Sequence, residues 1–572
     1  MMDQGSSFLR LLRNKYIKSI ILQFLVEDCV IKITTDYLND NYQFLQQLEH
    51  LENTDIQIRV LDRNDLEQLA KSPYKHLVTS MDLYHFIGDF DGTTSSIESL
   101  LMEVSAPNIK TLYNVPEPLI NYGLFNNTNI KRLSLYPNVS FGYDQDQHKI
   151  VLNEGMLPKN LRELKIIDEC DIYIEIASLP STLETLKWEV SSAEQLATSG
   201  FSNRVDCKLK IINSHPDQCV EFSKNPNLNI SSLSIYDSFS FHQRLPSTLK
   251  HLHITGNGDS LLPAIPNSVT SLTIDEYNGS LFNCSGCSFL PNNLSTLEMP
   301  DYNTALVANT LPCTLVSLKM DQFNQALHYS CLPANIEYLC LDSFNQPLQR
   351  DSIAKLNQLK VLKIPQYRHN LIADLIPPTV TEMKIHQQSL GLANALPASL
   401  TKLTIVEFNI RINLTPLIPA SVRTLKLVNH GDGSVDKDDC LEYSFAVTSY
   451  YDDFRDHQPS IVDSGEPEID LGGNIDEGAE PDNIILFNVQ LPLSITDLKL
   501  HIPFTIMAEF FPPTLKRLEF YSLNTLCNDN VFPPTLEYLH IHDSNYINTT
   551  NFIRPQNLKT LKIGDYLHYL DK

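Results

Sequence analysis

The most regular feature of the sequence is a short pattern of apolar and polar positions, Leu/Ile/Phe-Pro-x-Ser/Thr/Asn-Leu-x-x-Leu-x-Ile. Its copies begin at Leu179, Leu245, Ile265, Leu290, Leu311, Leu332, Ile376, Leu396, Ile418, Leu491, Phe511 and Phe532. In the Leu-x-Ile part, apolar and polar residues alternate with the two-residue period of a strand that buries one face. The Leu of this part recurs every 20–25 residues from Leu252 to Leu425, and again from Leu498 to Leu561. The pattern therefore predicts one short strand in each copy.

The proline and the spacing predict how these strands are arranged. Proline fixes φ and donates no hydrogen bond, so it belongs at the entry to a strand. A strand of about four residues cannot bury its own face, whereas stacked copies share one continuous core. The period is typical of leucine-rich repeats. We therefore expect a β-rich repeat solenoid of about 20 coils, an LRR-like stack of parallel strands with a short α-helical N-terminal cap.

Several copies are followed by a second motif that carries a family resemblance. Phe323-Asn324, Phe344-Asn345 and Phe408-Asn409 follow their strands at a similar distance, and Tyr277-Asn278 and Tyr302-Asn303 are variants of the motif. This combination resembles the FNIP repeat family, a relative of the leucine-rich repeats. The resemblance is strong over residues 245–427 and looser over 155–244 and 484–565. It implies a repeat architecture and a binding role, because the family has no single established activity.

Residues 1–75 lack the repeat. Phe8, Leu12, Tyr16, Ile20 and Phe24 stand four apart and predict an amphipathic helix, and a second helix is indicated by Leu38, Tyr42, Leu45 and Leu48. One interpretation is a cap that closes the open end of the stack, as stacked repeats require. A second is an F-box-like adaptor, as in some FNIP proteins, although the Leu-Pro that usually opens an F-box is missing. A third is a basic helix on a membrane surface.

Residues 429–483 interrupt the repeats, which we place at 76–428 and at 484–572, the latter with a C-terminal cap. The interruption contains sixteen Asp or Glu residues against Lys437 and Arg455, a net charge of −14. Such a charge density predicts a disordered acidic insertion. A small packed subdomain around the aromatic residues near Tyr450 is the alternative. Because the insertion would leave and rejoin the stack, Leu425 and Leu498 should lie on adjacent strands.

Composition narrows the classes of function. Lys plus Arg number 43 against 68 Asp plus Glu, so general nucleic-acid binding is disfavoured. Only 19 glycines are present, which argues against glycine-rich nucleotide folds. No run of about 18 uncharged apolar residues predicts a membrane span, and four basic residues interrupt the apolar N-terminal run. The eleven cysteines are then expected to be free thiols in a cytoplasmic protein.

Candidate catalytic chemistry is scarce. No phosphate-binding loop, metalloprotease motif or nucleophile elbow occurs. Cys284 and Cys287 form a CxxC pair, but no second pair follows at zinc-site spacing. His540 and His542 are interpreted as exposed polar positions of a strand. We therefore expect no enzyme activity, no cofactor, and no catalytic or metal-binding residues.

One position of the repeat is enriched in lysine compared with the rest of the chain. The position between the two inward residues of each strand should face outward, on the concave side of the stack. It is often lysine although the chain is acidic, and the residues that we select as candidate partner-binding positions are Lys319, Lys363, Lys384, Lys426 and Lys499. Lysine as a merely soluble residue at exposed strand sites is the alternative.

The sequence thus predicts a non-catalytic scaffold that presents an extended repeat surface to a partner protein, with acidic partners favoured by the lysines. The alternative is an F-box-like substrate adaptor of a ubiquitin ligase. We expect a monomer that binds neither nucleic acid nor membrane.

Overall fold

A computed structural model of the chain divides into two compact units, Met1–Thr270 and Ser271–Lys572, and each is described by itself. The residues described are 30–48, 54–60, 62–83, 100–101, 103–104, 108–116, 119–120, 125, 128–136, 150–152, 155–166, 172–174, 179–189, 207–214, 229–235, 245–255, 265–282, 288–328, 330–408, 413–428, 491–501, 505–506, 510–520, 525–526, 532–542, 555–563 and 566–569.

The first unit is built on a ladder of parallel strands that follow one another in chain order. The ten strands of this ladder among its described residues are β1 (Val30–Ile33), β2 (Asp55–Arg59), β3 (Ser80–Asp82), β4 (Thr111–Pro116), β5 (Arg132–Tyr136), β7 (Glu163–Ile166), β9 (Thr185–Glu189), β10 (Lys208–Ser214), β11 (Ile230–Ile235) and β12 (His251–Ile254). A separate parallel pair is formed by β6 (Ile150–Leu152) and β8 (Ile172–Ile174). One strand per coil is thus the rule from β1 onward.

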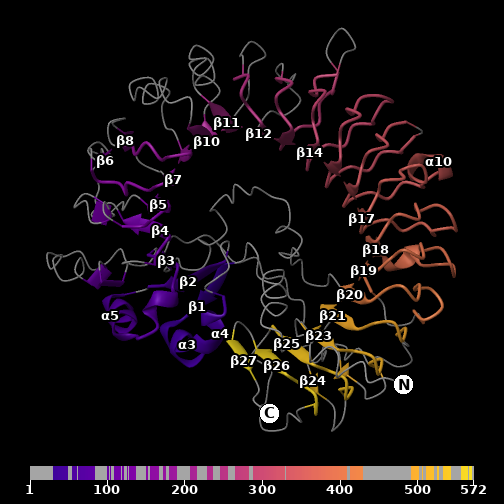
Figure 1. Cartoon of the computed structure of the whole chain (residues 1–572). Helices are drawn as coiled ribbons and strands as arrows, with labels where there is room; N and C mark the ends of the chain where they lie inside the picture. The colour runs from indigo at the N-terminus through magenta and orange to yellow at the C-terminus, as the bar shows by residue number, and fades with distance from the viewer. Residues whose placement is uncertain are drawn as a thin grey trace, which may run out of the picture. The chain divides into compact units, whose positions relative to one another are not determined.

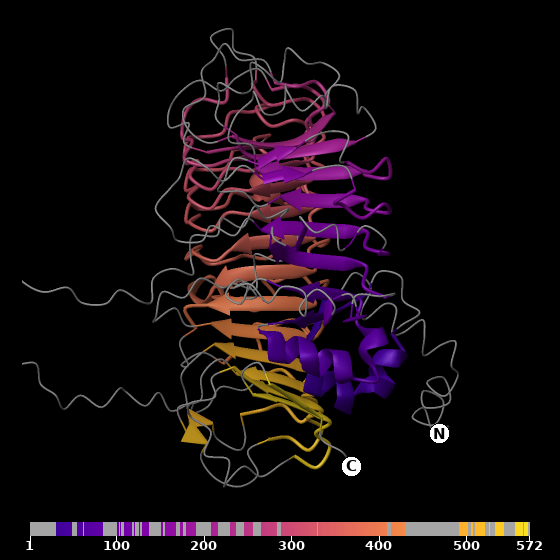
Figure 2. The same ribbon diagram turned by 90° about the vertical axis from the view of Figure 1, so that its left-hand side faces the viewer.

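The second unit continues the same arrangement with twelve parallel strands in its described part. They are β13 (Ser271–Ile274), β14 (Thr296–Glu298), β15 (Ser317–Lys319), β16 (Tyr338–Cys340), β17 (Val361–Ile364), β18 (Glu382–His386), β19 (Lys402–Val406), β20 (Thr424–Val428), β21 (Asp497–His501), β23 (Arg517–Phe520), β25 (Tyr538–Ile541) and β26 (Thr560–Ile563). Figure 1 shows these strands along the inner side of the curved stack of this unit, and Figure 2 shows the orange and yellow strands side by side. The expected parallel solenoid is confirmed, with slightly more coils than expected.

The second unit also holds a few elements outside this ladder. The antiparallel strand β27 (Tyr566–Tyr569) pairs with β26, and β22 (Thr505–Ile506) pairs with β24 (Thr525–Leu526). A short helix, α10 (Arg350–Ile353), lies on the outer side of the stack, opposite the strands (Figure 1), and a 3₁₀ turn, η5 (Gln387–Ser389), directly follows β18. Among the residues described, no helix has the length and apolarity needed to cross a membrane.

The N-terminal region combines helices with strands. The expected helix around Leu38–Leu48 is present as two, α3 (Thr35–Asp40) and α4 (Tyr42–Gln46), and α5 (Arg63–Lys71) and the 3₁₀ turn η1 (Lys75–Leu77) follow. Thr34 and Asp62 cap α3 and α5 by accepting backbone N–H groups. Residues 1–75 were expected to contain helices only, but they also contribute strands β1 and β2 to the ladder. Neither strand is preceded by the proline motif. The helix predicted between Phe8 and Leu25 lies outside the described residues.

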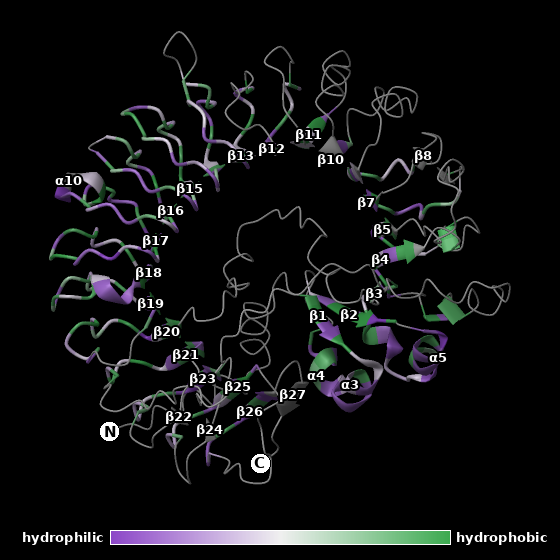
Figure 3. Ribbon diagram, turned by 180° about the vertical axis from the view of Figure 1, so that it is seen from behind, coloured by the Kyte–Doolittle hydropathy of each residue, from purple (hydrophilic) through white to green (hydrophobic). Residues whose placement is uncertain are grey.

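The alternation of the repeat explains which residues form the core. Leu318, Leu339 and Leu362 are partners on neighbouring strands and are at most 1% exposed. Many of the residues between the inward positions, such as Lys319 and Lys363, are half-buried on the opposite face, and hydrophilic and hydrophobic colours alternate along the strands in Figure 3. Each buried leucine contributes about 2 kcal/mol of hydrophobic stabilisation. Stacking of identical positions therefore produces one continuous apolar column in each unit.

Where the Ser/Thr/Asn position of the repeat is threonine, its side chain can hydrogen-bond to the preceding coil. The Thr314 hydroxyl lies 2.7 and 2.8 Å from the carbonyl oxygens of Asn292 and Leu294 and donates to them in a shared hydrogen bond. Thr182, Thr514 and Thr535 make the same contact with their preceding coils. These side chains satisfy backbone carbonyls at a turn where no strand partner is available.

The Phe-Asn motif makes a second tie on the returning side of the coils. The aromatic rings are buried and stacked, with centroids 6.5 Å apart for Phe323 and Phe344 and 6.1 Å for Phe344 and Tyr367. Each asparagine accepts the backbone N–H of the same position in the next coil: the N–H of Asn324 donates to Oδ1 of Asn303 at 2.8 Å. The same contact joins Asn278 to Asn303, Asn324 to Asn345, and Asn345 to Arg368. The motif is thus structural.

The ladder is unbroken where the sequence predicts the acidic insertion. Leu425 of β20 pairs in register with Leu498 of β21, as expected, and Lys426 pairs with Lys499. The insertion itself, residues 429–483, lies outside the described residues, as do Cys284 and Cys287.

Candidate functional site

The five candidate lysines lie on one face of the second unit. They occupy the same strand position on β15, β17, β18, β20 and β21. The strand register makes Lys363 the direct neighbour of Lys384, and Lys426 the direct neighbour of Lys499. Cys340 separates Lys319 from Lys363, and Thr404 separates Lys384 from Lys426. All five side chains are half-buried. We call these five residues the lysine column.

Acidic side chains of the same unit contact both ends of the lysine column. Nζ of Lys319 lies 3.6 Å from a carboxylate oxygen of Asp321, and Nζ of Lys499 lies 2.8 Å from Glu519. Burial acts to lower the pKa of Lys319, but Asp321 and Glu298 outweigh it and raise that pKa. In the middle of the column, Nζ of Lys363 lies 5.6 Å from the centre of the Tyr338 ring, within the range of a cation–π contact.

Two acids beside the lysine column have pKa values shifted in opposite directions. Burial raises the pKa of Asp321 to about 6, although Lys319 opposes the shift. Burial also acts to raise the pKa of Glu519, but hydrogen bonds to His540 and Lys499 reverse the effect and lower it to about 2. Glu519 therefore carries a fixed negative charge at neutral pH, whereas Asp321 titrates just below neutrality.

The first unit carries three consecutive lysines at the same repeat position, Lys165, Lys187 and Lys210. Burial and the two neighbouring lysines lower the pKa of Lys187. Burial and Lys210 likewise lower the pKa of His251. This is the densest run of cations at this position among the described coils. The selection of site residues from sequence omitted it, although reading the column coil by coil shows the three lysines side by side.

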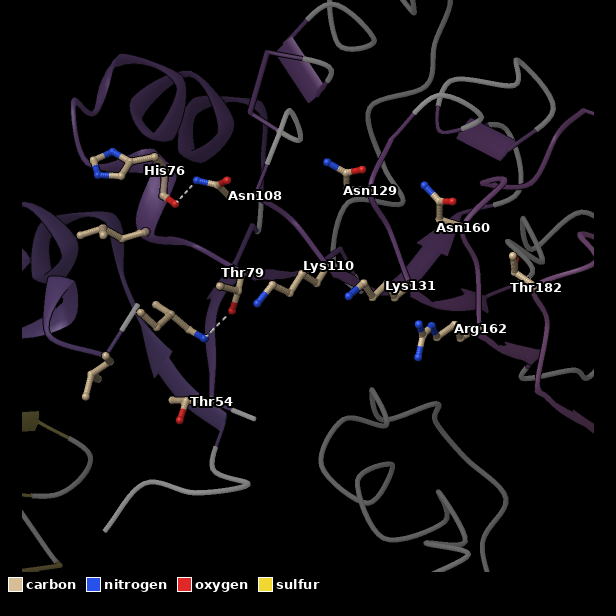
Figure 4. A pocket seen from close by; sticks show the side chains of 13 residues that line it. Thr54, His76, Thr79, Asn108, Lys110, Asn129, Lys131, Asn160, Arg162 and Thr182 are labelled. Atoms are coloured by element: carbon tan, nitrogen blue, oxygen red, sulfur yellow. Dashed lines mark hydrogen bonds between the residues drawn. The ribbon is translucent and has the colours of Figure 1, made fainter. Parts of the chain in front are cut away.

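A groove of about 560 Å³ in the first unit was missed altogether by sequence reasoning. Two rows of side chains line it, and Figure 4 shows Asn108, Asn129 and Asn160 along one row and three cations along the other. The cations are Lys110, Lys131 and Arg162, each immediately before strand β4, β5 or β7. Arg162 also lies 3.6 Å from Glu184. The signal that could have found the groove is the triplet Asn-x-Lys/Arg, which recurs in three successive coils.

Two groups of side chains in the second unit bring together atoms that could hold a metal ion. One is Asp321, Cys340 and Asp342, and the other is Glu519, His540 and His542. In the first group, burial and Asp342 raise the pKa of the Cys340 thiol well above its usual value. A thiol binds metal as its thiolate, so this group is poorly suited to metal binding. The second group offers two imidazoles and a carboxylate.

Comparisons with known proteins agree with the repeat. The FNIP Repeat family model matches residues 323–353, which include two of the Phe-Asn motifs. No curated protein matches the chain.

Two solved structures are similar in fold class. CroV588, described as a novel circular LRR protein structure, is 18% identical with a TM-score of 0.40, and the match covers 88% of this chain and 71% of that one. YopM from Yersinia enterocolitica WA-314 is 15% identical with a TM-score of 0.25, covering 76% and 87%. Both superpositions are loose, so the assignment rests on the family match and on the strand register. Residues 323–353 thus match the FNIP repeat, and the strand register shows the same one-strand coil in the neighbouring repeats.

Proposed function

We propose that this chain is a non-catalytic scaffold that binds an acidic segment of a partner protein along the lysine column. The observation that carries the proposal is the pair of in-register lysine neighbours, Lys363 with Lys384 and Lys426 with Lys499. Neighbouring parallel strands lie about 4.8 Å apart, so like charges at this position repel each other. A partner that supplies carboxylates relieves this repulsion, and this relief makes the free energy of binding more favourable.

The dimensions of the lysine column define the segment that fits. From β17 to β21 the column crosses five neighbouring strands, a span of about 19 Å at the usual strand spacing. An extended peptide covers about 3.3 Å per residue. A segment of about six residues with carboxylates at alternate positions therefore reaches from Lys363 to Lys499.

The test measures binding of a fluorescent hexapeptide rich in Asp and Glu by anisotropy. The variant combines Lys363→Glu, Lys384→Glu and Lys426→Glu. The control combines Lys355→Glu, Lys360→Glu and Lys516→Glu, which changes the net charge equally at exposed positions that lie outside the strands. We expect the variant to bind about 10- to 100-fold more weakly, because each exposed ion pair contributes up to about 1 kcal/mol, and the control to bind like the wild type.

Salt provides a second readout, because screening at about 8 Å under physiological conditions weakens contacts between half-exposed charges. Wild-type affinity should fall steeply as salt rises. Equal affinities of the variant and the control, or no peptide binding by the wild type, would refute the proposal.

The proposal extends to the N-terminal region, which acts as a cap of the stack, and to the whole protein, which is a cytoplasmic monomer. Support for the cap comes from α3, α4 and α5, which bury Leu38, Leu45, Leu66 and Leu69 beside strands that join the ladder. Sedimentation velocity and cell fractionation test the monomer and its location. Co-purification of the full chain with a cullin complex would instead support an F-box-like adaptor of a ubiquitin ligase.

A further inference from the structure

Three side chains with metal-binding atoms meet near the C-terminal end of the second unit. Glu519 of β23 and His540 of β25 are register partners on neighbouring strands. His542 lies just after the end of β25, two residues beyond His540, and the two imidazole rings lie side by side. The backbone N–H of His542 donates to the carbonyl oxygen of Phe520 at 2.8 Å, which fixes the coil beside Glu519.

The geometry of this group is compact. One ligand atom from each of Glu519, His540 and His542 lies within 4.8 Å of the others. Nδ1 of His540 is 3.6 Å from Oε1 of Glu519, and the centres of the two imidazole rings are 3.6 Å apart. His540 is only 4% exposed, which is unusual for a polar residue on the outward face of a strand. Small side-chain rotations would bring all three atoms to a common ion.

The chemistry of the three groups suits a transition metal of the zinc type. Two imidazoles and one carboxylate form a ligand set that zinc uses when it keeps a position open for water or another ligand. Metal binding requires the ionised carboxylate and the neutral imidazoles, and both forms are accessible to these residue types near neutral pH. Oxygen-preferring ions such as Ca²⁺ and Mg²⁺ fit this set poorly, because two of the three ligands are nitrogen atoms.

A neighbouring lysine holds the carboxylate in place. Nζ of Lys499 lies 2.8 Å from Oε2 of Glu519, so Oε1 faces His540. Outer partners of this kind orient the ligands of metal sites and affect affinity. On the other side, Lys562 is the register neighbour of His540 and adds a positive charge that the carboxylate offsets.

We propose that Glu519, His540 and His542 form a binding site for a divalent transition-metal ion, with Zn²⁺ as the preferred ion. The site leaves at least one coordination position for water or for a side chain of a bound partner. Lys499 is a positioning residue, because it acts on the metal through Glu519.

The experiment titrates the full-length protein with Zn²⁺ by calorimetry and with Co²⁺ by visible absorption. His542→Ala and Glu519→Gln each remove one ligand, and the second variant keeps the shape of the side chain. The control is His253→Ala, since His251 and His253 form the same alternating pair on β12, where the His253 ring contacts the hydroxyl groups of Ser234 and Thr255. Circular dichroism verifies that each variant is folded.

We expect one Zn²⁺ site per chain, which His542→Ala and Glu519→Gln weaken by more than about 100-fold, beyond the loss usual for an outer partner. Lys499→Met should weaken it by about tenfold. Co²⁺ should give visible bands in the wild type and in His253→Ala, and the bands should be lost in the ligand variants. The proposal is overturned if the wild type binds no Zn²⁺, or if the ligand variants bind it as tightly as the control does. Equal affinities of the wild type for Ca²⁺ and Zn²⁺ would also overturn the choice of ion.

Discussion

Lys187 in the first unit and Lys319 in the second occupy the same position of the repeat, yet their pKa values are shifted in opposite directions. Burial and the neighbours Lys165 and Lys210 lower the pKa of Lys187. Lys319 is also opposed by burial, but Asp321 and Glu298 raise its pKa. The two backbones are equivalent, since each lysine follows a buried leucine and lies between two register partners.

The difference shows which properties the repeat determines. The repeat places the side chain on the outward face, whereas the neighbouring coils decide whether its charge is stabilised. The position of a residue within its coil therefore predicts which face its side chain occupies. Its electrostatic environment can be predicted only from the residues in the neighbouring coils. The four predictions below test this separation.

The largest effect should be the same in both units. Leu186 and Leu318 immediately precede the two lysines and are fully buried. Leu186→Ala and Leu318→Ala should each lower the free energy of unfolding by about 3 kcal/mol, because each leaves a cavity in the apolar column. Chemical denaturation followed by circular dichroism measures both. A difference larger than about 2 kcal/mol between the two variants would show that the two repeat positions are not structurally equivalent.

The second effect concerns the acid that distinguishes the Lys319 site. Burial raises the pKa of Asp321 to about 6, above the value of about 3.9 in an unfolded chain. The folded state thus holds this proton more tightly, and wild-type stability falls as pH rises from about 4 to about 6. Asp321→Asn should therefore be more stable than the wild type by about 1.5 kcal/mol at pH 7.5. At pH 4 the two proteins should be equally stable, and an advantage that persists there would contradict this assignment.

The third effect should have opposite signs in the two units. Lys187→Met removes two in-register repulsions and should raise the free energy of unfolding by about 1 kcal/mol. Lys319→Met removes a favourable charge next to Asp321 and should lower it by up to about 1 kcal/mol. Both substitutions keep the apolar stem, so packing changes little. Changes of the same sign in parallel denaturation curves would refute the comparison.

The smallest effect is expected where a cation is exposed. Lys360 lies 2.7 Å from Glu337, but both side chains are largely solvated. Lys360→Met should change the free energy of unfolding by less than about 0.5 kcal/mol, since exposed ion pairs contribute little. A loss as large as that of Lys319→Met would show that burial does not set the scale of these effects.

Much of the fold could be predicted because its determinants lie within one coil. The alternation around Leu318 and the proline before it predict the strand, and equal spacing predicts the pairing of Leu425 with Leu498. β1 and β2 could not be predicted as coils, because Val30–Ile33 and Asp55–Arg59 lack the proline motif.

The site residues were harder to predict because their contacts cross coils. The five candidate lysines were correctly placed on one face, but the ion pair of Lys499 with Glu519 depends on the next strand. The same holds for His540, whose interpretation as an exposed residue was wrong: contact with Glu519 and His542 leaves it buried. The groove beside Lys110 depends on the residue before each strand, a position that the alternation within the strand does not describe.

The pairing of Leu425 with Leu498 has a consequence for how this chain can be lengthened. These leucines are 73 positions apart, against about 21 for an ordinary coil, yet they are direct strand neighbours. For a flexible loop, closure entropy grows only with the logarithm of length, so the extra residues cost about 1 kcal/mol. The connection between β20 and β21 is therefore a suitable insertion site for foreign sequence. A fluorescent protein or an affinity tag spliced there should leave the ladder on both sides intact.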